Sequence, residues 1–311
     1  MVVATPEPAE SVGALAYAVL RAQIAAVVAH EEGTRRGEDA DELHDMRVAT
    51  RRLRAALSLF ADVVPVEAET LRAELGWLAA GLGAVRDVDV QLEQIAQWQA
   101  EADQADQSGF QALRTAIERL RPAARTALLA QLESPRYRRL LAHFQRMLDE
   151  GPPPSAAARR PVLEVAPSLA SKRYKALRKS ADSLTPASPP HELHAARIRG
   201  KRLRYAAEFV APVYGRPARD FITTLVALQD LLGRHQDAYV AIERLRLLLA
   251  EHGEDLPPRA LFLLGQMAER YAHEAVQLRA ALAGTYAAVC GPAWRTFRHT
   301  MKQRRADAVA T

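Results

Sequence analysis

Apolar residues recur every three to four positions along almost the whole chain, which is the spacing of amphipathic helices. The segments that carry this pattern are rich in Ala, Leu, Arg and Glu, all strong helix formers. No run of alternating Val, Ile and Thr with hairpin turn signals interrupts them. The pattern therefore predicts an all-α protein with almost no strands.

Glycine, proline and short polar stretches divide this pattern into about six helices in each half of the chain. The first half is predicted to hold helices at 11–32, 39–62, 65–84, 86–102, 107–132 and 135–149. The second half is predicted to hold helices at 162–183, 191–213, 216–233, 235–251, 256–284 and 291–306. Among the stops, Gly83 and Gly233 are expected to end helices, and Ser134-Pro135 is expected to begin one.

A proline-rich stretch, 151–161, separates the two halves and suits a linker or an ordered crossover. We therefore expect an N-terminal half at 1–150 and a C-terminal half at 162–311, which together form one domain. The length allows either half to bury a core.

The two halves repeat each other at an offset of 150 residues. Residues 42–54 (ELHDMRVATRRLR) return as residues 192–204 (ELHAARIRGKRLR), with seven of the thirteen positions identical. The same offset aligns 82–90 with 232–240. Two halves of common origin predict two homologous, antiparallel helical bundles related by a pseudo-twofold axis. A solenoid is disfavoured, because only two copies occur.

The repeat places one histidine and three cations along one edge of a helix in each half. At about 100° per residue, the four positions of each copy fall within about 80° of arc. Like charges at this spacing repel by a few tenths of a kcal/mol per pair. A chain that repeats such an arrangement is predicted to hold an anion there, and arginine suits phosphate because its planar group donates two parallel hydrogen bonds. The alternative is a solvated basic face. The matched residues are His44, Arg47, Arg51 and Arg54 in the first copy and His194, Arg197, Lys201 and Arg204 in the second.

The two histidines have several possible roles. As metal ligands they lack the paired spacing of a zinc-binding helix, and no cysteine cluster accompanies them, so no metal site is predicted. A phosphoryl acceptor is disfavoured, because Asp45 follows His44 but Ala195 follows His194. A hydrogen-bond donor to a phosphate oxygen fits best, since a bound anion favours the protonated ring. A capping or buried histidine remains the alternative without a ligand.

Asp87 and Asp237 occupy matching positions four residues after Gly83 and Gly233. Each is expected to cap the following helix or to pair with an arginine of the basic edge, and so to support the site structurally. A catalytic role is disfavoured, because no second acid is placed reproducibly nearby.

More cations accompany the second copy than the first. The helix that precedes the second basic edge carries Lys172, Arg173, Lys175 and Lys179, whereas the matching helix of the first half carries Arg21. All five are candidate anion-binding residues, although a solvated face is the usual explanation for such a group. We expect the second half to contribute more charge.

Composition narrows the function classes. The net charge is +5, and the single cysteine, Cys290, excludes an intrachain disulfide and favours a reducing cytoplasm. No signal peptide or apolar run of 18 residues is recognised, so we expect a soluble protein without a membrane partner. Phosphate-binding glycine loops and nucleophile signatures are absent. Neither a catalytic function nor a cofactor is predicted.

These motifs resemble the CHAD (conserved histidine α-helical domain) family over about residues 10–305. The resemblance rests on the histidine followed by basic residues, Arg52 and Arg202 included, and on the later Leu-Gly and Asp of each copy. Gln236 departs from the pattern, because the first copy has Arg86 there. The resemblance implies two helical bundles around a basic central cavity that binds inorganic polyphosphate, in a cytoplasmic protein associated with polyphosphate granules.

Two rival functions remain. A nucleic-acid-binding helical protein would use base stacking, but aromatic residues make up only 6% of the chain. A phosphohydrolase or phosphotransferase would use the histidines catalytically. The sparse aromatics favour a bare phosphate chain as the ligand, and nucleic acid is not expected as the partner.

Overall fold

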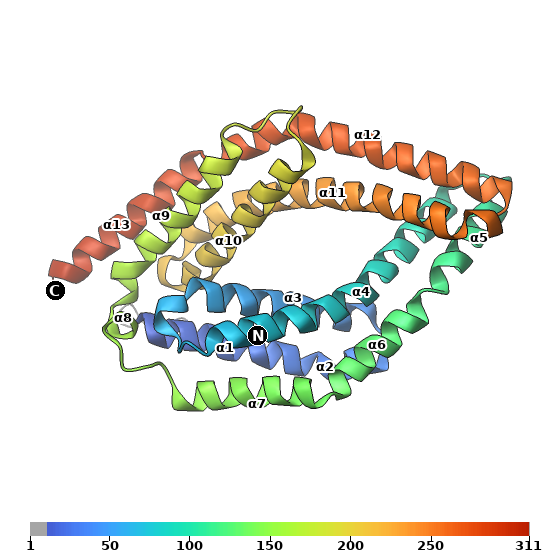
Figure 1. The fold of residues 1–311 in the computed structure, drawn as a ribbon. Helices are drawn as coiled ribbons and strands as arrows, with labels where there is room; N and C mark the ends of the chain where they lie inside the picture. Colours follow the sequence, from blue (N-terminus) through green and yellow to red (C-terminus); the bar gives the residue numbers. More distant parts are fainter. Residues whose placement is uncertain (1–10, 311) are drawn as a thin grey trace.

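A computed structural model describes residues 11–310 and places nearly all of them in helices (Figure 1). Within that range the only β feature is an isolated antiparallel bridge between Ser11 and Pro161. The predicted all-α class is therefore confirmed.

The first half begins where Ser11 accepts a hydrogen bond from the backbone N–H of Ala14, which caps the first helix. Ser134 caps a later helix in the same way, with Pro135 as its first residue, as predicted. The helices of this half are α1 (Val12–Ala29), α2 (Glu31–Arg36), α3 (Ala40–Leu59), α4 (Ala68–Glu101), α5 (Gln107–Glu118), α6 (Arg121–Glu133) and α7 (Pro135–Glu150), with the 3-10 turn η1 (Ala61–Val63).

The proline-rich stretch between the halves includes one short helix, α8 (Ala156–Arg159), so it is an ordered crossover. The bridge between Ser11 and Pro161 ties its end to the start of α1. The second half contains α9 (Val162–Ala181), α10 (Pro190–Tyr214), α11 (Arg216–His252), α12 (Pro258–Val289) and α13 (Pro292–Ala310), with the 3-10 turn η2 (Gly253–Asp255).

The helix breaks predicted at Gly83 and Gly233 are wrong, because α4 and α11 run straight through them. A glycine inside a helix costs only about 1 kcal/mol relative to alanine. Leu82 and Val85 are fully buried on either side of Gly83, and their packing outweighs that cost. The predicted helix at 107–132 is divided instead between Glu118 and Arg121, and Pro122 lies in the first turn of α6.

Helices α1, α3, α4 and α7 pack together, and α9, α10, α11 and α13 form the matching group. Both groups share one hydrophobic core, in which the rings of Phe60 and Phe209 lie 6.1 Å apart. The second half has the single long helix α12 where the first half has α5 and α6. The pseudo-twofold relation therefore stays a prediction.

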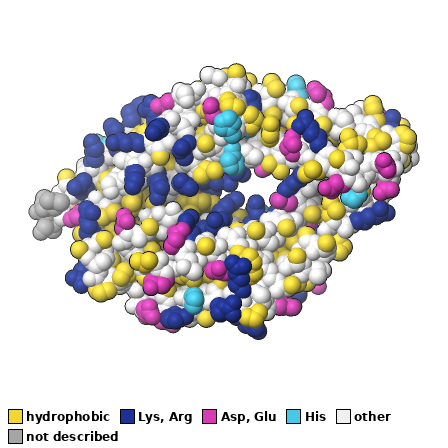
Figure 2. Space-filling model, viewed as in Figure 1, with side chains coloured by type: hydrophobic (Ala, Val, Ile, Leu, Met, Phe, Trp, Pro, Cys, Tyr) yellow, Lys and Arg dark blue, Asp and Glu magenta, His cyan; other side chains and the backbone are white. Residues whose placement is uncertain are grey.

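The halves also meet at a second place, far from the first. The long helices α4 and α11 diverge from the shared core and are joined again where α5 packs on α12 (Figure 1). A separate hydrophobic cluster, which includes Leu113, Ile117 and Leu263, fills this junction. Between the two junctions the space-filling view shows an opening through the molecule, with Lys and Arg side chains gathered on one side of it and acidic and histidine side chains also at its edge (Figure 2).

One described stretch, Val12–Arg36, is long and apolar enough to be a candidate membrane span, with a mean hydropathy of 1.8. The stretch contains Arg21 and Gln23, so it is not an uninterrupted run of 18 uncharged apolar residues, and the expectation that none occurs is not contradicted. In the structure α1 packs against α3, and 44% of the apolar window is buried inside the protein. A core helix of a soluble protein has the same properties, so the stretch is weak evidence for a membrane span.

Candidate functional site

The two repeated basic edges lie on α3 and α10, which contact each other where the halves share their core. On α3, Leu43, Met46 and Leu53 are buried, so that side of the helix faces the core. Arg51 and Arg54 are half-buried and lie along one edge of this core-facing side. The apolar stripe thus turns each basic edge toward the partner helix.

A cavity of about 380 Å³ lies between the two edges. Seven of its thirteen lining residues are basic and none is acidic. The lining residues are Arg51, Arg54, Ala55, Ser58, Leu59, Arg72, Arg173, Arg197, Ile198, Lys201, Arg202, Tyr205 and Ala206. The arrangement concentrates positive charge in a space of the size that small ligands occupy.

The cavity brings together six of the residues predicted to bind an anion: Arg51, Arg54, Arg173, Arg197, Lys201 and Arg202. Sequence reasoning missed Arg72, which reaches the cavity from α4 and also donates to Glu69 at 2.8 Å. It also missed Gly76 of α4, whose absent side chain leaves room for the Arg54 guanidinium.

Tyr205 links the two copies across the cavity. Nε of Arg51 donates a hydrogen bond to the Tyr205 hydroxyl at 3.1 Å. The guanidinium carbons of Arg52 and Arg204 lie 5.6 Å and 5.1 Å from the centre of its ring. One buried aromatic side chain therefore orders three arginines, one by a hydrogen bond and two by cation–π contacts.

Arg52 and Arg204, although predicted to bind the anion, do not line the cavity. Each lies 2.9 Å from a carboxylate oxygen of Glu208, which joins the two halves through one acid. Their positive charge is thus matched by Glu208, whereas among the cations of the cavity lining only Arg72 has an ion-pair partner, Glu69, within the described residues.

Arg47 does not line the cavity but is close enough to repel Lys201 electrostatically, and the four other predicted cations lie away from the cavity. Arg21 donates to the backbone carbonyl of Leu148 and so fastens α1 to the end of α7. Lys172, Lys175 and Lys179 are exposed on α9, on the side of the helix away from Arg173. Of the basic group on α9, only Arg173 is brought to the cavity.

The two histidines lie one turn or more before the cavity and differ from each other. Nδ1 of His44 is buried and has no hydrogen-bond partner among the described residues. Nδ1 of His194 lies 2.8 Å from Oε1 of Gln236, the residue that departs from the repeat. Within residues 11–310, no group of three His, Cys, Asp or Glu side chains could hold a metal ion.

Asp87 and Asp237 stand inside α4 and α11, so the predicted capping role is wrong. Asp87 forms its ion pair with Arg244 of α11 and thereby joins the halves. It also acts electrostatically on Arg47 of the basic edge, whose pKa it raises against the larger lowering effect of burial. Asp237 contributes electrostatically to Arg197, whose pKa it raises against the larger lowering effect of burial.

The cavity destabilises positive charge. Burial, followed by repulsion from Arg51, Arg197 and Arg47, lowers the pKa of Lys201 to about 7, and Asp237 opposes this only weakly. Burial also lowers the pKa of Arg47 and Arg197, each with a contribution from neighbouring cations. An anion placed among these groups would remove their mutual repulsion.

Two buried arginine N–H groups without hydrogen-bond partners also favour a bound anion. Nε of Arg54 and Nε of Arg197 are buried without a hydrogen-bond partner among the described residues. A buried donor without a partner costs roughly 1–3 kcal/mol. Oxygen atoms of a bound anion would satisfy such donors.

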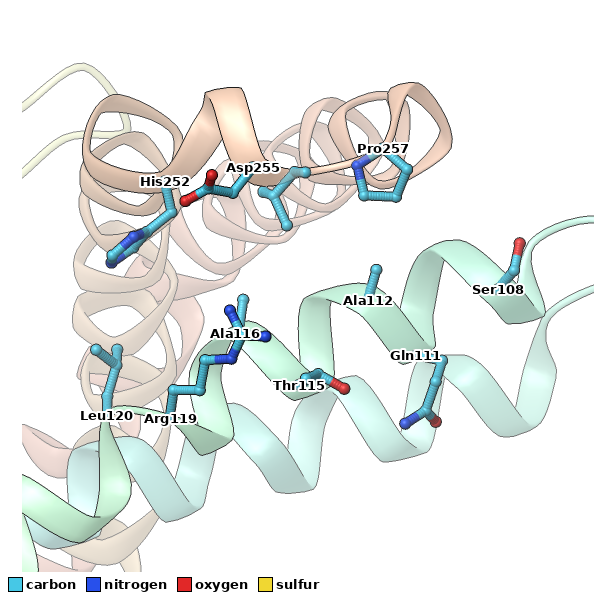
Figure 3. Close-up of a pocket in the computed structure, with 11 residues that line it drawn as sticks. Ser108, Gln111, Ala112, Thr115, Ala116, Arg119, Leu120, His252, Asp255 and Pro257 are labelled. Carbon is cyan, nitrogen blue, oxygen red and sulfur yellow. The ribbon is translucent and has the colours of Figure 1, made fainter.

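A second cavity, of about 400 Å³, lies at the far junction between α5 and η2 (Figure 3). Arg119 reaches it from the end of α5, and His252 and Asp255 reach it from the opposite side. This second cavity has both positively and negatively charged side chains, whereas the charged residues of the cavity between α3 and α10 are all basic. None of the predicted site residues lines the second cavity.

Comparisons with known proteins agree with the helical fold. The family model described as CHAD domain matches residues 18–246. Two similar curated proteins, both uncharacterized, are from Mycobacterium tuberculosis strains CDC 1551 / Oshkosh and ATCC 25618 / H37Rv. Each is 29% identical over 224 residues, which cover 68% of this chain. The match covers only 41% of each relative, so the chain spans about two fifths of their length.

Two solved structures are similar to this one. The crystal structure of the CHAD domain from the plant Ricinus communis has a TM-score of 0.76 and 28% identity, covering 92% of this chain and 95% of its own. PptA from Streptomyces chartreusis has a TM-score of 0.72 and 19% identity, covering 89% of this chain and 99% of its own. At that identity the second likeness concerns the fold alone.

Proposed function

The chain belongs to the CHAD domain family, and we propose that it binds inorganic polyphosphate in the basic cavity between α3 and α10. One observation carries the proposal: seven basic side chains and no acidic one line the cavity at the meeting of the two repeats. The family resemblance implies the same ligand, and a polymer of phosphate groups without bases or sugars matches a lining that is rich in arginine.

The polyanion would lie across both basic edges at once. Arg51 and Arg54 would contact it from α3, and Arg197 and Lys201 from α10. The opening between the two junctions leaves room for a linear chain to pass through the molecule (Figure 2). Phosphate oxygens would then replace the partners that the buried arginine Nε atoms lack.

The proposed function is binding without turnover. The cavity lining contains no carboxylate or imidazole that could act as a general base on an attacking water. We further propose, from the family resemblance, that the protein is cytoplasmic and associates with polyphosphate granules. Neither the sequence nor the geometry requires a cofactor for this role.

Calorimetric titration with long-chain polyphosphate at increasing salt tests the proposal. Each phosphate neutralised by a lysine or arginine releases counterions, so log K should fall linearly and steeply with log salt concentration. An affinity that hardly changed with salt would contradict binding through the seven basic side chains.

Competition and turnover assays address the rival functions. Tyr205 is the one aromatic residue of the lining, and its buried ring is covered by arginines, so it offers no platform for base stacking. Long-chain polyphosphate should therefore displace DNA or RNA at equal phosphate concentration, and the reverse outcome would favour nucleic acid. Phosphate release in the presence of a divalent metal, abolished by His44→Ala, would establish an enzyme instead.

A further inference from the structure

Lysine is scarce in this chain and its placement is uneven. The sequence has 42 lysines and arginines, of which five are lysines, all in the second half. Four of them are exposed: Lys172, Lys175, Lys179 and Lys302. The fifth, Lys201, is half-buried, and it stands where the first copy of the repeat has Arg51.

Lys201 is the one primary amine in the lining of the basic cavity, since the other six cations there are arginines. Guanidinium groups stay protonated at any physiological pH and are not nucleophiles. The lining has no carboxylate to hold the Lys201 side chain as an ammonium ion. The cavity thus combines several anion-binding groups with one amine of different chemistry.

The surroundings of Lys201 favour its neutral form. From α3, Arg51 and Arg47 repel the ammonium, and from α10 Arg197 does the same, while Asp237 of α11 attracts it only weakly. Together with burial, which is the largest cause, they bring the pKa of Lys201 to about 7. A desolvated lysine beside other cations is a recognised form of activated amine nucleophile.

We propose that Lys201 forms a reversible imine with small phosphate esters that carry an aldehyde, so that the basic cavity captures this class of compound covalently. The neutral Nζ attacks the carbonyl carbon, and a carbinolamine forms as the proton moves from nitrogen to oxygen. Loss of one water then leaves the C=N double bond, with no oxidant or reductant involved. Arg51 and Arg197 hold the phosphate group nearby.

This inference rests on the proposed function only in that the cavity holds phosphate. The volume of the basic cavity, about 380 Å³, lies within the range of binding sites for small molecules. A compound with both a phosphate and an aldehyde would use the arginines and the amine together. A bound adduct would also occupy the space that polyphosphate needs.

The test uses pyridoxal 5′-phosphate as the probe, with borohydride reduction and mass spectrometry to locate the modified lysines. At pH 7.5 an unperturbed lysine is almost wholly protonated, so Lys201 should react at least about tenfold faster than the exposed lysines. Lys201→Arg should lose this fast labelling, and the matched control Lys175→Arg should keep it. Pyridoxal, which lacks the phosphate, should label Lys201 more slowly than the probe.

Equal labelling of all five lysines, or fast labelling that persists in Lys201→Arg, would overturn the inference. The substitution places at 201 the residue that the first copy already has, and circular dichroism checks that the fold is kept. Long-chain polyphosphate should protect Lys201 from the probe. Fast labelling of Lys201 without such protection would support the imine and contradict polyphosphate binding at this cavity; calorimetric binding of polyphosphate with no preferential labelling would overturn the imine alone.

Discussion

The two basic edges come from one repeated sequence, yet they differ in what surrounds their cations. On α3, Arg51 and Arg54 border the cavity, and the matching neighbours Ala55 and Ser58 are small. On α10 the corresponding positions hold Tyr205 and Glu208. The first copy therefore supplies charge and space, and the second supplies charge together with the groups that order it.

Tyr205 and Glu208 explain how two cationic edges can lie against each other. Tyr205 accepts a hydrogen bond from Arg51, and Glu208 pairs with both Arg52 and Arg204. Apart from Arg72, which pairs with Glu69, the cations that line the cavity form no ion pair within the described residues. Duplication provides the cations, and divergence decides which of them stay available to a ligand.

Charge reversal in both copies should have the largest effect. Arg51→Glu with Lys201→Glu should weaken polyphosphate binding at least about 100-fold, because each charge-assisted hydrogen bond contributes roughly 1.5–3 kcal/mol. The matched control is Lys172→Glu with Lys175→Glu, which changes the net charge equally on an exposed surface. Calorimetry at fixed salt measures both variants. Similar losses in the two would mean that net charge alone governs binding.

The second-largest effect is expected on stability, when the carboxylate of Glu208, which only the second copy has, is removed. Glu208→Gln leaves Arg52 and Arg204 partly buried without a counter-charge, which should lower the free energy of unfolding by about 2 kcal/mol. The control is Glu243→Gln, whose pair with Arg246 is exposed and should matter little. Urea denaturation gives both values. An unchanged midpoint for Glu208→Gln would show that the acid does not hold the edges together.

Replacing Lys201 by arginine, the residue that the first copy has at this position, should change the pH dependence of polyphosphate binding. Polyphosphate favours the protonated amine, and the pKa of Lys201 is about 7 in the free protein, so affinity should fall about tenfold from pH 6.5 to 8.5. Lys201→Arg keeps its charge over this range and should lose much of that fall. Titration of the ligand itself is common to both proteins and cancels in the comparison. Parallel pH profiles would contradict the role of Lys201.

Substitution of the two histidines should have the smallest effect on polyphosphate binding. His44→Ala should weaken binding only a few-fold, because the ring does not line the cavity and a single neutral hydrogen bond contributes about 1 kcal/mol. His194→Ala should instead act mainly on stability, since it removes the contact with Gln236. Calorimetry and thermal melts of the two variants distinguish these effects. A hundred-fold loss of affinity in His44→Ala would place that histidine in direct contact with the ligand.

The sequence predicted the helical class and six of the seven basic residues of the cavity, because periodicity and repetition are local properties of the chain. It could not predict Asp87 beside Arg244, which are 157 positions apart, or Tyr205 beside Arg51. Such contacts depend on how helices cross, which the repeat does not encode. The wrong breaks at Gly83 and Gly233 have a related cause, since packing overrode a weak local preference.

The central claim is that both copies hold one ligand at one site. Calorimetric titration with a short polyphosphate of defined length tests this most directly, in the wild type and in the single variants Arg51→Glu and Lys201→Glu. We predict one ligand per protein chain in the wild type, and a loss of nearly all binding in either single variant. Two ligands per chain, with each variant removing only one of them, would contradict a shared cavity.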